Sequence, residues 1–178
     1  HTGDLVSAGA SEGPWQSELF NRKFEETASL LSRLPLMLVV GNHDISPIFP
    51  IVGQQSTLDL VKKYFPYSFL NREDSFYYSF DYGPVHFSII DQYNSPYSEG
   101  SPQYNWLRSD LEGTSKPWKV VAFHDPAWSA NSAPGTTQGH ENNVTAQSLH
   151  PLLLSNSVQL VLQGHNHYYA RCTVEGID

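Results

Sequence analysis

Short apolar runs end directly in polar, histidine-containing blocks at three places in this 178-residue sequence. The three transitions are Leu36–Val40 into Gly41-Asn42-His43-Asp44, Lys119–Phe123 into His124, and Val158–Leu162 into Gln163-Gly164-His165-Asn166-His167. A short continuous apolar run of this kind predicts a buried strand. Because ligands of open α/β sheets bind outside the carboxyl ends of the strands, we expect these polar side chains to gather at one edge of a sheet.

Helical segments are predicted between the strands, as an α/β layered fold requires. They cover residues 15–34, 56–65 and 149–154, together with a segment that begins at Ser101-Pro102. Two aromatic and β-branched runs, Ser75–Asp81 and Val85–Asp91, flank Tyr82-Gly83-Pro84 and predict a β-hairpin. Residues 127–143 are small and polar, which predicts a long surface loop. No linker interrupts the pattern, so residues 1–178 are expected to form one domain.

The charge and the apolar runs exclude two classes of partner. The net charge is −8 and the sequence pI is about 5.4, whereas binding to nucleic acid needs clustered Lys and Arg. No apolar run approaches the roughly 20 residues that span a membrane. Bound divalent metals outweigh nearby carboxylates locally, so the acidic balance still allows a small phosphorylated substrate. The sequence does not specify an oligomeric state.

The polar blocks fit a centre that holds two metal ions. Asp4, at the end of an expected short strand, is suited to bridge two cations, because a carboxylate has two oxygens. Asn42, His124 and one histidine of the pair His165 and His167 would complete one metal site, and the other histidine of the pair would bind the second metal. Nitrogen and oxygen ligands favour Mn, Fe or Zn, as divalent or mixed-valence ions. Each block alone could be a turn or a packed histidine pair, but together they predict a shared site.

In order along the chain, these blocks resemble the calcineurin-like metallophosphoesterases. That superfamily has Asp-x-His, Gly-Asp, Gly-Asn-His-Asp/Glu, a lone His, and Gly-His-x-His. The sequence matches the last four as Gly3-Asp4, Gly41-Asn42-His43-Asp44, His124 and Gly164-His165-Asn166-His167. The purple acid phosphatase branch is the most similar. Its shared features are Tyr77-Tyr78-Ser79-Phe80, Val85-His86-Phe87, Gln103-Tyr104-x-Trp106-Leu107, Pro117-Trp118, His124-x-Pro126-x-Trp128, and Tyr169 and Arg171 after the last block.

The resemblance implies a fold, a ligand set and a reaction. It implies mixed β-sheets that form a β-sandwich flanked by helices. It assigns His165 with Asn42 and His124 to one metal, and His167 with Asp4 to the other. A hydroxide that bridges the metals would attack phosphorus in line.

The resemblance also implies roles for residues around the metals. His43 would stabilise the transition state and protonate the leaving oxygen, while Asp44 would hold the His43 ring. Asn42 and His140, the latter in the loop after His124, are expected to contact the substrate.

The sequence departs from the branch in two respects. The branch has a metal-binding Tyr, the source of its purple colour, three residues after the bridging Asp, where this chain has Ser7. The Asp-x-His block is also missing, and the abrupt start and end of the sequence lead us to expect a chain truncated at both ends.

Hydrolysis of phosphate esters is therefore the leading functional hypothesis. One alternative is a nucleotide pyrophosphatase or phosphodiesterase, which the same metal site could serve. The other is a non-catalytic binding module with an incomplete metal site, although such a module would not need His43 and Asp44. The composition, rich in aromatic residues and poor in Cys and Met, leans toward a secreted or periplasmic location.

Overall fold

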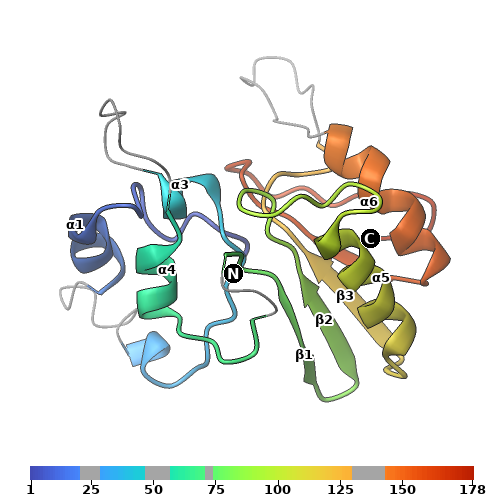
Figure 1. Cartoon of the computed structure of the whole chain (residues 1–178), viewed down its shortest axis with the longest axis horizontal. Coiled ribbons are helices and arrows are strands. Elements are labelled where there is room, and N and C mark those ends of the chain that lie inside the picture. The colour runs from blue at the N-terminus through green and yellow to red at the C-terminus, as the bar shows by residue number, and fades with distance from the viewer. Residues whose placement is uncertain (21–28, 47–56, 71–73, 130–142) are drawn as a thin grey trace.

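A mixed sheet of four strands, in the order β1-β2-β3-β4, organises the chain (Figure 1). The computed structural model describes residues 1–20, 29–46, 57–70, 74–129 and 143–178. The strands are β1 (Tyr78–Tyr82), β2 (Val85–Ile89), β3 (Trp118–Ala122) and β4 (Leu160–Leu162). β1 pairs with β2 antiparallel, whereas β2 with β3 and β3 with β4 are parallel. The prediction of an α/β fold with mixed strands is confirmed.

The predicted β-hairpin is present as β1 and β2. Tyr78 pairs with Ile89 and Tyr82 with Val85, so the turn contains only Gly83 and Pro84. Gly83 has a φ of 56°, a left-handed conformation that glycine adopts without a steric penalty. Phe80 stacks on Phe87 across the hairpin, with ring centroids 4.9 Å apart.

Each predicted helical segment contains a helix, with a different length, and α1 and α3 are additional short helices that were not predicted. They are α1 (Glu12–Pro14), the π-helix η1 (Trp15–Leu19), α3 (Asn42–Ile45), α4 (Asp59–Tyr64), α5 (Pro102–Gly113) and α6 (Asn143–Ser155). The Ser101 side chain accepts a hydrogen bond from the Tyr104 N–H at 3.2 Å, as expected for an N-cap followed by proline. α6 begins six residues before the predicted segment at 149 and continues through Pro151.

Two apolar clusters pack on opposite sides of the sheet. Leu107 and Leu111 of α5 and Leu149 and Leu153 of α6 are fully buried against Val121 of β3. The other cluster joins the N-terminal segments to alternate strand residues; it includes Trp15, Leu38, Val61, Tyr78, Ile89 and Ala122. In Figure 1, α1, α3 and α4 accordingly lie beyond β1, whereas α5 and α6 cover the other side of the sheet.

Two expectations about the fold need correction, and a third is tested only in part. Leu36–Val40 is extended, and Leu38 to Val40 are buried, but the segment is not a strand of the sheet. Instead it bonds to the first residue of the chain. The Val39 N–H donates to the His1 carbonyl, and the Met37 carbonyl accepts from the His1 amino group. The described residues form one sheet, not the two of a β-sandwich. The helix predicted over 15–34 is helical at η1 and at residues 29–31, and its segment 21–28 lies outside the described residues.

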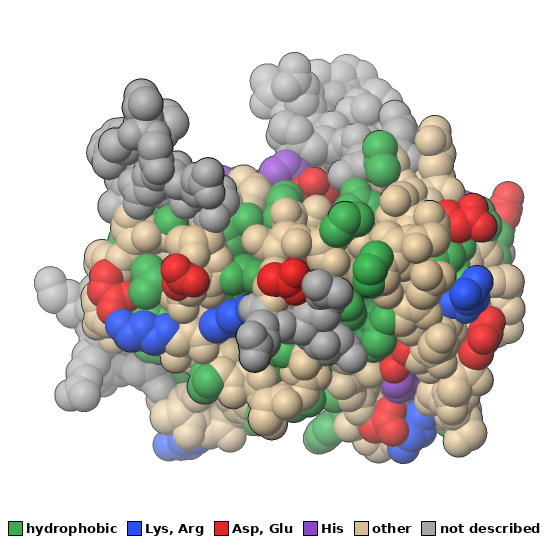
Figure 2. Space-filling model, viewed as in Figure 1, with side chains coloured by type: hydrophobic (Ala, Val, Ile, Leu, Met, Phe, Trp, Pro, Cys, Tyr) green, Lys and Arg blue, Asp and Glu red, His purple; other side chains and the backbone are tan. Residues whose placement is uncertain are grey.

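The described surface agrees with the charge of the sequence. On the face shown in Figure 2, Lys and Arg side chains are scattered among acidic and neutral ones and do not form a continuous basic patch. Among the described residues, no helix has both the length and the apolar character needed to cross a membrane.

Candidate metal centre

Four side chains from four separate segments meet beyond the carboxyl ends of β3 and β4. Asp4 Oδ2 lies 3.1 Å from His124 Nε2, and His165 Nδ1 lies 3.3 Å from the same nitrogen. Asn42 Oδ1 lies 3.1 Å from His165 Nδ1. One potential ligand atom of each of Asp4, His124 and His165 lies within 4.8 Å of those of the other two. Two oxygens and two imidazole nitrogens therefore face a common point.

The parallel pairing of β3 and β4 brings the two histidines together. The Phe123 N–H donates to the Leu162 carbonyl at 3.1 Å, and the Gly164 N–H donates to the His124 carbonyl at 3.0 Å. These bonds continue the ladder past the last strand residues, so the loops that carry His124 and His165 leave the sheet side by side. This is the edge at which ligands bind in open α/β sheets.

Two of the four residues have a strained backbone. Asp4 has a φ of 57° and His165 a φ of 65°, in the left-handed region that costs non-glycine residues of order 1–3 kcal/mol. Gly3, with a φ of 94°, lies so close to the His124 ring that a Cβ at this position would overlap Nδ1. The surrounding structure therefore holds the chain in a conformation that places Asp4 and His165 against His124.

His124 is held in the orientation that a metal ligand needs. Its ring is buried, and Nδ1 lies 2.6 Å from the Thr2 carbonyl. In the neutral ring this bond requires the proton on Nδ1 and leaves the lone pair on Nε2, which faces Asp4. Hydrogen bonds of this kind to the second ring nitrogen fix the tautomer of metal-binding histidines.

The pKa shifts reflect the same contact. Burial by itself lowers the pKa of His124, but the bonds to Asp4 and Thr2 outweigh it and raise the pKa overall. Burial by itself raises the pKa of Asp4, but His124 and the His43 N–H outweigh it and lower the pKa overall. Asp4 is therefore a carboxylate that attracts cations.

Asp44 has a different position from the one expected. Its carboxylate accepts hydrogen bonds from four backbone N–H groups: those of Asp4 at 2.9 Å, Leu5 at 2.7 Å, Val6 at 3.3 Å and Gly41 at 2.9 Å. The side chain is fully buried, and burial raises its pKa despite these donors. Asp44 therefore ties the loop of Asp4 to the loop of Asn42, and the expectation that it holds the His43 ring is replaced by this contact.

The His43 ring is held by Ser7 instead. His43 Nδ1 lies 2.9 Å from the Ser7 carbonyl, and the backbone N–H of His43 donates to Asp4 Oδ1 at 2.9 Å. The Ser7 hydroxyl donates to the Glu18 carboxylate at 2.7 Å, not to the Asp4 carboxylate. His43 itself is exposed beside the four-residue cluster.

Two further predicted site residues, His167 and His140, stay untested by this cluster. His167 is exposed, two residues beyond His165, and its role at a second metal stays a prediction. His140 lies outside the described residues, so its predicted contact with substrate also stays a prediction.

Sequence reasoning missed a second group of polar residues at the same edge. Gln92 and Tyr93 follow β2, and Asp125 follows His124. Gln92 Oε1 accepts from the His124 N–H at 2.8 Å and from the Asp125 N–H at 2.6 Å, and the Tyr93 hydroxyl donates to Asp125 Oδ1. Their position just after predicted strands is the sequence signal that could have indicated them.

The donor atoms fit a metal ion. Ligands at 2.0–2.2 Å from one ion lie about 3.0–3.4 Å from one another in octahedral or tetrahedral geometry. The three contacts at 3.1, 3.1 and 3.3 Å fall in this range. Imidazole nitrogen with carboxylate and amide oxygen is a set that suits Zn, Fe or Mn. The structure supports a site for one ion formed by Asp4, Asn42, His124 and His165.

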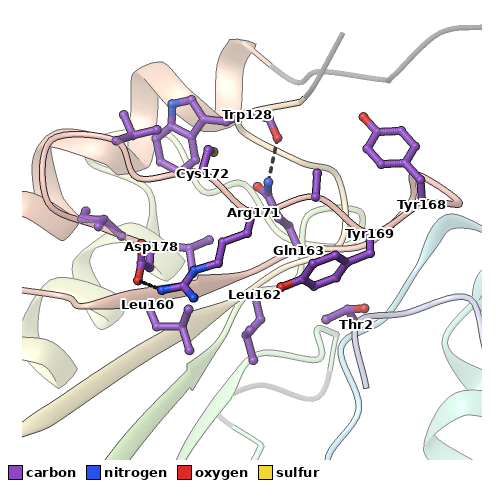
Figure 3. Close-up of a pocket in the computed structure, with 14 residues that line it drawn as sticks. Thr2, Trp128, Leu160, Leu162, Gln163, Tyr168, Tyr169, Arg171, Cys172 and Asp178 are labelled. Atoms are coloured by element: carbon purple, nitrogen blue, oxygen red, sulfur yellow. Dashed lines mark hydrogen bonds and ion pairs between the residues drawn. The ribbon is translucent and has the colours of Figure 1, made fainter. Parts of the chain in front are cut away.

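A cavity of about 330 Å³ lies next to this centre, on the outer side of β4 (Figure 3). Its lining includes Gln163, whose side-chain amide donates to the Trp128 carbonyl at 2.7 Å, and Arg171, which pairs with Asp178. None of the four converging residues lines it. The cavity is therefore adjacent to the metal centre and separate from it.

Comparison with known proteins agrees with the fold and shows the family. The family model described as calcineurin-like phosphoesterase matches residues 1–169. Purple acid phosphatase 18 of Arabidopsis thaliana is 31% identical over 172 residues, which cover 95% of this chain and 37% of the relative. Purple acid phosphatase 21 of the same plant is 34% identical over 173 residues, with coverage of 95% and 37%.

A solved structure is similar in fold. Purple acid phosphatase PPD1 from yellow lupin (Lupinus luteus) seeds aligns with a TM-score of 0.67 and 24% sequence identity. The alignment covers 98% of this chain and 33% of that chain. The chain thus spans about a third of the length of these relatives.

Proposed function

The chain belongs to the calcineurin-like phosphoesterase family, and on this basis we propose that it carries the metal centre of an enzyme that hydrolyses phosphate esters. One observation carries the proposal: Asp4, Asn42, His124 and His165, from four separate segments, bring their donor atoms together at 3.1–3.3 Å. The relatives reported above are all named phosphatases, which favours this function over a nucleotide pyrophosphatase or phosphodiesterase and over a non-catalytic module.

The four residues would hold the first metal ion, and Asp4 with His167 would contribute to a second. Bound metal would supply Lewis acidity toward a phosphoryl oxygen and toward the attacking water. The protein contributes the fixed geometry: Thr2 sets the tautomer of His124, and Asp44 ties the loops of Asp4 and Asn42 together. Such orienting contacts affect metal affinity or activity by about 10–100-fold in known sites.

His43 is the proposed proton donor to the leaving oxygen. Its ring is exposed and therefore accessible to substrate. In the doubly protonated ring, Nδ1–H would donate to the Ser7 carbonyl at 2.9 Å and Nε2–H would carry the proton that passes to the leaving oxygen. The bond from its backbone N–H to Asp4 Oδ1 fixes its distance from the proposed metal. A histidine in this position can give a proton to the leaving group without itself binding the ion.

The first test uses His43→Ala in the full-length protein that contains this chain. We expect kcat for phenyl phosphate to fall by about 10²–10⁴-fold, with unchanged metal content by elemental analysis. The loss should be smaller for p-nitrophenyl phosphate, whose leaving group needs less protonation. Asn42→Ala is the contrasting variant, in which metal is lost. If His43→Ala loses its metal, or keeps full activity on phenyl phosphate, the assignment of His43 is wrong.

A further inference from the structure

The loop after β3 carries the buried His124 past the end of the sheet. Beyond the last strand residue, the N–H groups of His124 and Asp125 bond to a side chain instead of to a neighbouring strand. Gln92 Oε1, which lies three residues beyond the end of β2, accepts from these two groups at 2.8 and 2.6 Å. The two lone pairs of one amide oxygen therefore take the place of a strand partner.

The amide nitrogen of Gln92 completes this contact. Nε2 donates to the Asp125 carbonyl at 3.0 Å and to Thr145 Oγ1 at 2.9 Å. An amide side chain has two acceptor positions and two donor hydrogens, so all four positions of Gln92 are used. Thr145 belongs to α6 and is fully buried. Gln92 therefore ties the loop of His124 both to the end of β2 and to α6.

Gln163 holds the same loop from the other side. It directly follows β4, and its Oε1 accepts from the Ala127 N–H at 3.0 Å, while its Nε2 donates to the Trp128 carbonyl at 2.7 Å (Figure 3). β2 and β4 are the two neighbours of β3 in the sheet. The loop after β3 thus lies between two glutamine side chains, one from each neighbouring strand.

These contacts act on a residue whose ring is also fixed. Thr2 holds His124 Nδ1 at 2.6 Å, and His124 Nε2 lies 3.1 Å from Asp4 Oδ2 and 3.3 Å from His165 Nδ1. Site residues must be held within about 0.5 Å of the productive geometry. Because the Thr2 bond orients the ring but not the loop that carries it, the position of Nε2 also depends on the residues that hold the backbone.

We propose that Gln92 and Gln163 are positioning residues of the candidate metal centre, which clamp the loop after β3 from its two neighbouring strands and set the position of His124. The inference rests on the proposed function, since it needs a metal at this centre. It deepens that function by giving control over metal affinity to two side chains outside the four converging residues.

The test measures binding of Co²⁺ to the metal-free full-length protein, by titration and by the visible absorption spectrum of the bound ion. Gln92→Met keeps the approximate length of the side chain and removes its amide, so we expect Co²⁺ affinity to fall by about 10–100-fold. The intensity of the Co²⁺ bands should change as well, because the geometry around the ion changes with the position of His124. Gln163→Met, which leaves Gln92 in place, should weaken binding by about 10-fold.

Gln159→Met is the matched control. At the opposite end of β3, Gln159 Oε1 accepts from the Lys119 N–H at 2.7 Å, and the amide nitrogen donates to the Pro117 carbonyl at 3.3 Å. This variant removes the same kind of contact away from the centre. We expect a lower urea midpoint, with less than about a twofold change in Co²⁺ affinity and an unchanged spectrum, because distant sites act independently.

Unchanged Co²⁺ affinity and spectrum in a folded Gln92→Met protein would overturn the inference, and the same result in Gln163→Met would overturn the role of Gln163. Equal weakening in Gln159→Met would also overturn it, because affinity would then follow overall stability. If circular dichroism shows that Gln92→Met does not fold, Gln163→Met decides by the same criteria. A wild-type protein that binds no Co²⁺ would instead contradict the proposed metal centre itself.

Discussion

Each residue of the candidate centre is held by contacts with distant parts of the chain. Asp44 accepts from backbone groups 38–40 residues earlier, His124 bonds to Thr2, and His43 bonds to Ser7. The strained φ angles of Asp4 and His165 persist because these contacts fix their loops. The site is therefore largely preformed by the protein, and ligand positions should be sensitive to residues that do not bind metal.

Asp44→Asn tests this dependence. The change replaces one acceptor oxygen by an NH₂ group that must face backbone N–H donors, so we expect a loss of about 2–4 kcal/mol in the free energy of unfolding. Metal affinity should fall by about 10–100-fold. Urea denaturation and metal titration provide the measurements.

Asp59→Asn is the control for Asp44→Asn, since it changes an exposed Asp in the first turn of α4 and should cost less than about 1 kcal/mol. An Asp44→Asn protein that unfolds and binds metal like the wild type would show that the four hydrogen bonds have no role.

The second residue-scale prediction concerns Ser7. In the purple acid phosphatases that the sequence resembles, a Tyr at this position gives the colour, whereas Ser7 donates its hydroxyl to Glu18. We therefore expect the full-length protein loaded with iron to lack an intense visible phenolate-to-iron absorption band. The zinc-loaded protein provides the blank spectrum. Strong purple absorption in the iron-loaded form would mean that another tyrosine binds the metal.

At the level of elements, the sequence predicts best what local signals determine. The hairpin follows from two β-rich runs around Gly83-Pro84, and α5 follows from the Ser101 cap before Pro102. Leu36–Val40 has the composition of a buried strand, and Leu38 to Val40 are buried, but strand formation depends on a partner. Among the described residues its backbone bonds go to His1, and the hydroxyls of Tyr67 and Tyr78 donate to its Leu36 and Leu38 carbonyls. The residue types of the candidate site could likewise be recognised from short sequence blocks. The hydrogen-bond partners of Asp44 and Asp125 could not, because they depend on tertiary packing.

A polar cluster around the buried His86 joins β1, β2 and α5, and it predicts a pH dependence of stability. His86 of β2 contacts Asp81 of β1 at 2.8 Å and Asp110 of α5 at 2.9 Å, while Lys116 lies 3.5 Å from Asp81. The bond to Asp110, and then that to Asp81, raise the pKa of His86 despite its burial. The charged ring thus ties α5 to the hairpin.

The sign of this dependence follows from the direction of the shift. His86 has an unfolded pKa of about 6.5, and its folded pKa is higher. Its stabilising contribution is complete below the unfolded value and is lost as the pH rises through the folded pKa. We expect the free energy of unfolding of wild type minus that of His86→Asn to decrease over this range, by urea denaturation at several pH values. A difference that stays constant or increases with pH would contradict the link.

At the scale of the whole molecule, the two faces of the sheet differ in how far other elements cover them. α5 and α6 bury the side that carries Val121, while the opposite side exposes Trp118, 55% accessible, and Leu162, 39% accessible. The expectation of a β-sandwich places a second sheet over such a face, and no second sheet is present among the residues that the structure describes. The candidate centre lies at the ends of β3 and β4 and takes Asp4 and Asn42 from segments outside the sheet. A second sheet is therefore not needed to bring these four residues together.

The most direct test of the central claim is anomalous X-ray diffraction from crystals of the full-length protein loaded with Zn²⁺ or Mn²⁺. We predict a metal peak within about 2.0–2.3 Å of Asp4 Oδ2, Asn42 Oδ1, His124 Nε2 and His165 Nδ1. Data collected above and below the absorption edge would identify the ion. A metal-loaded, active crystal with no anomalous peak at these four atoms, or with its ions bound by other residues, would contradict the account.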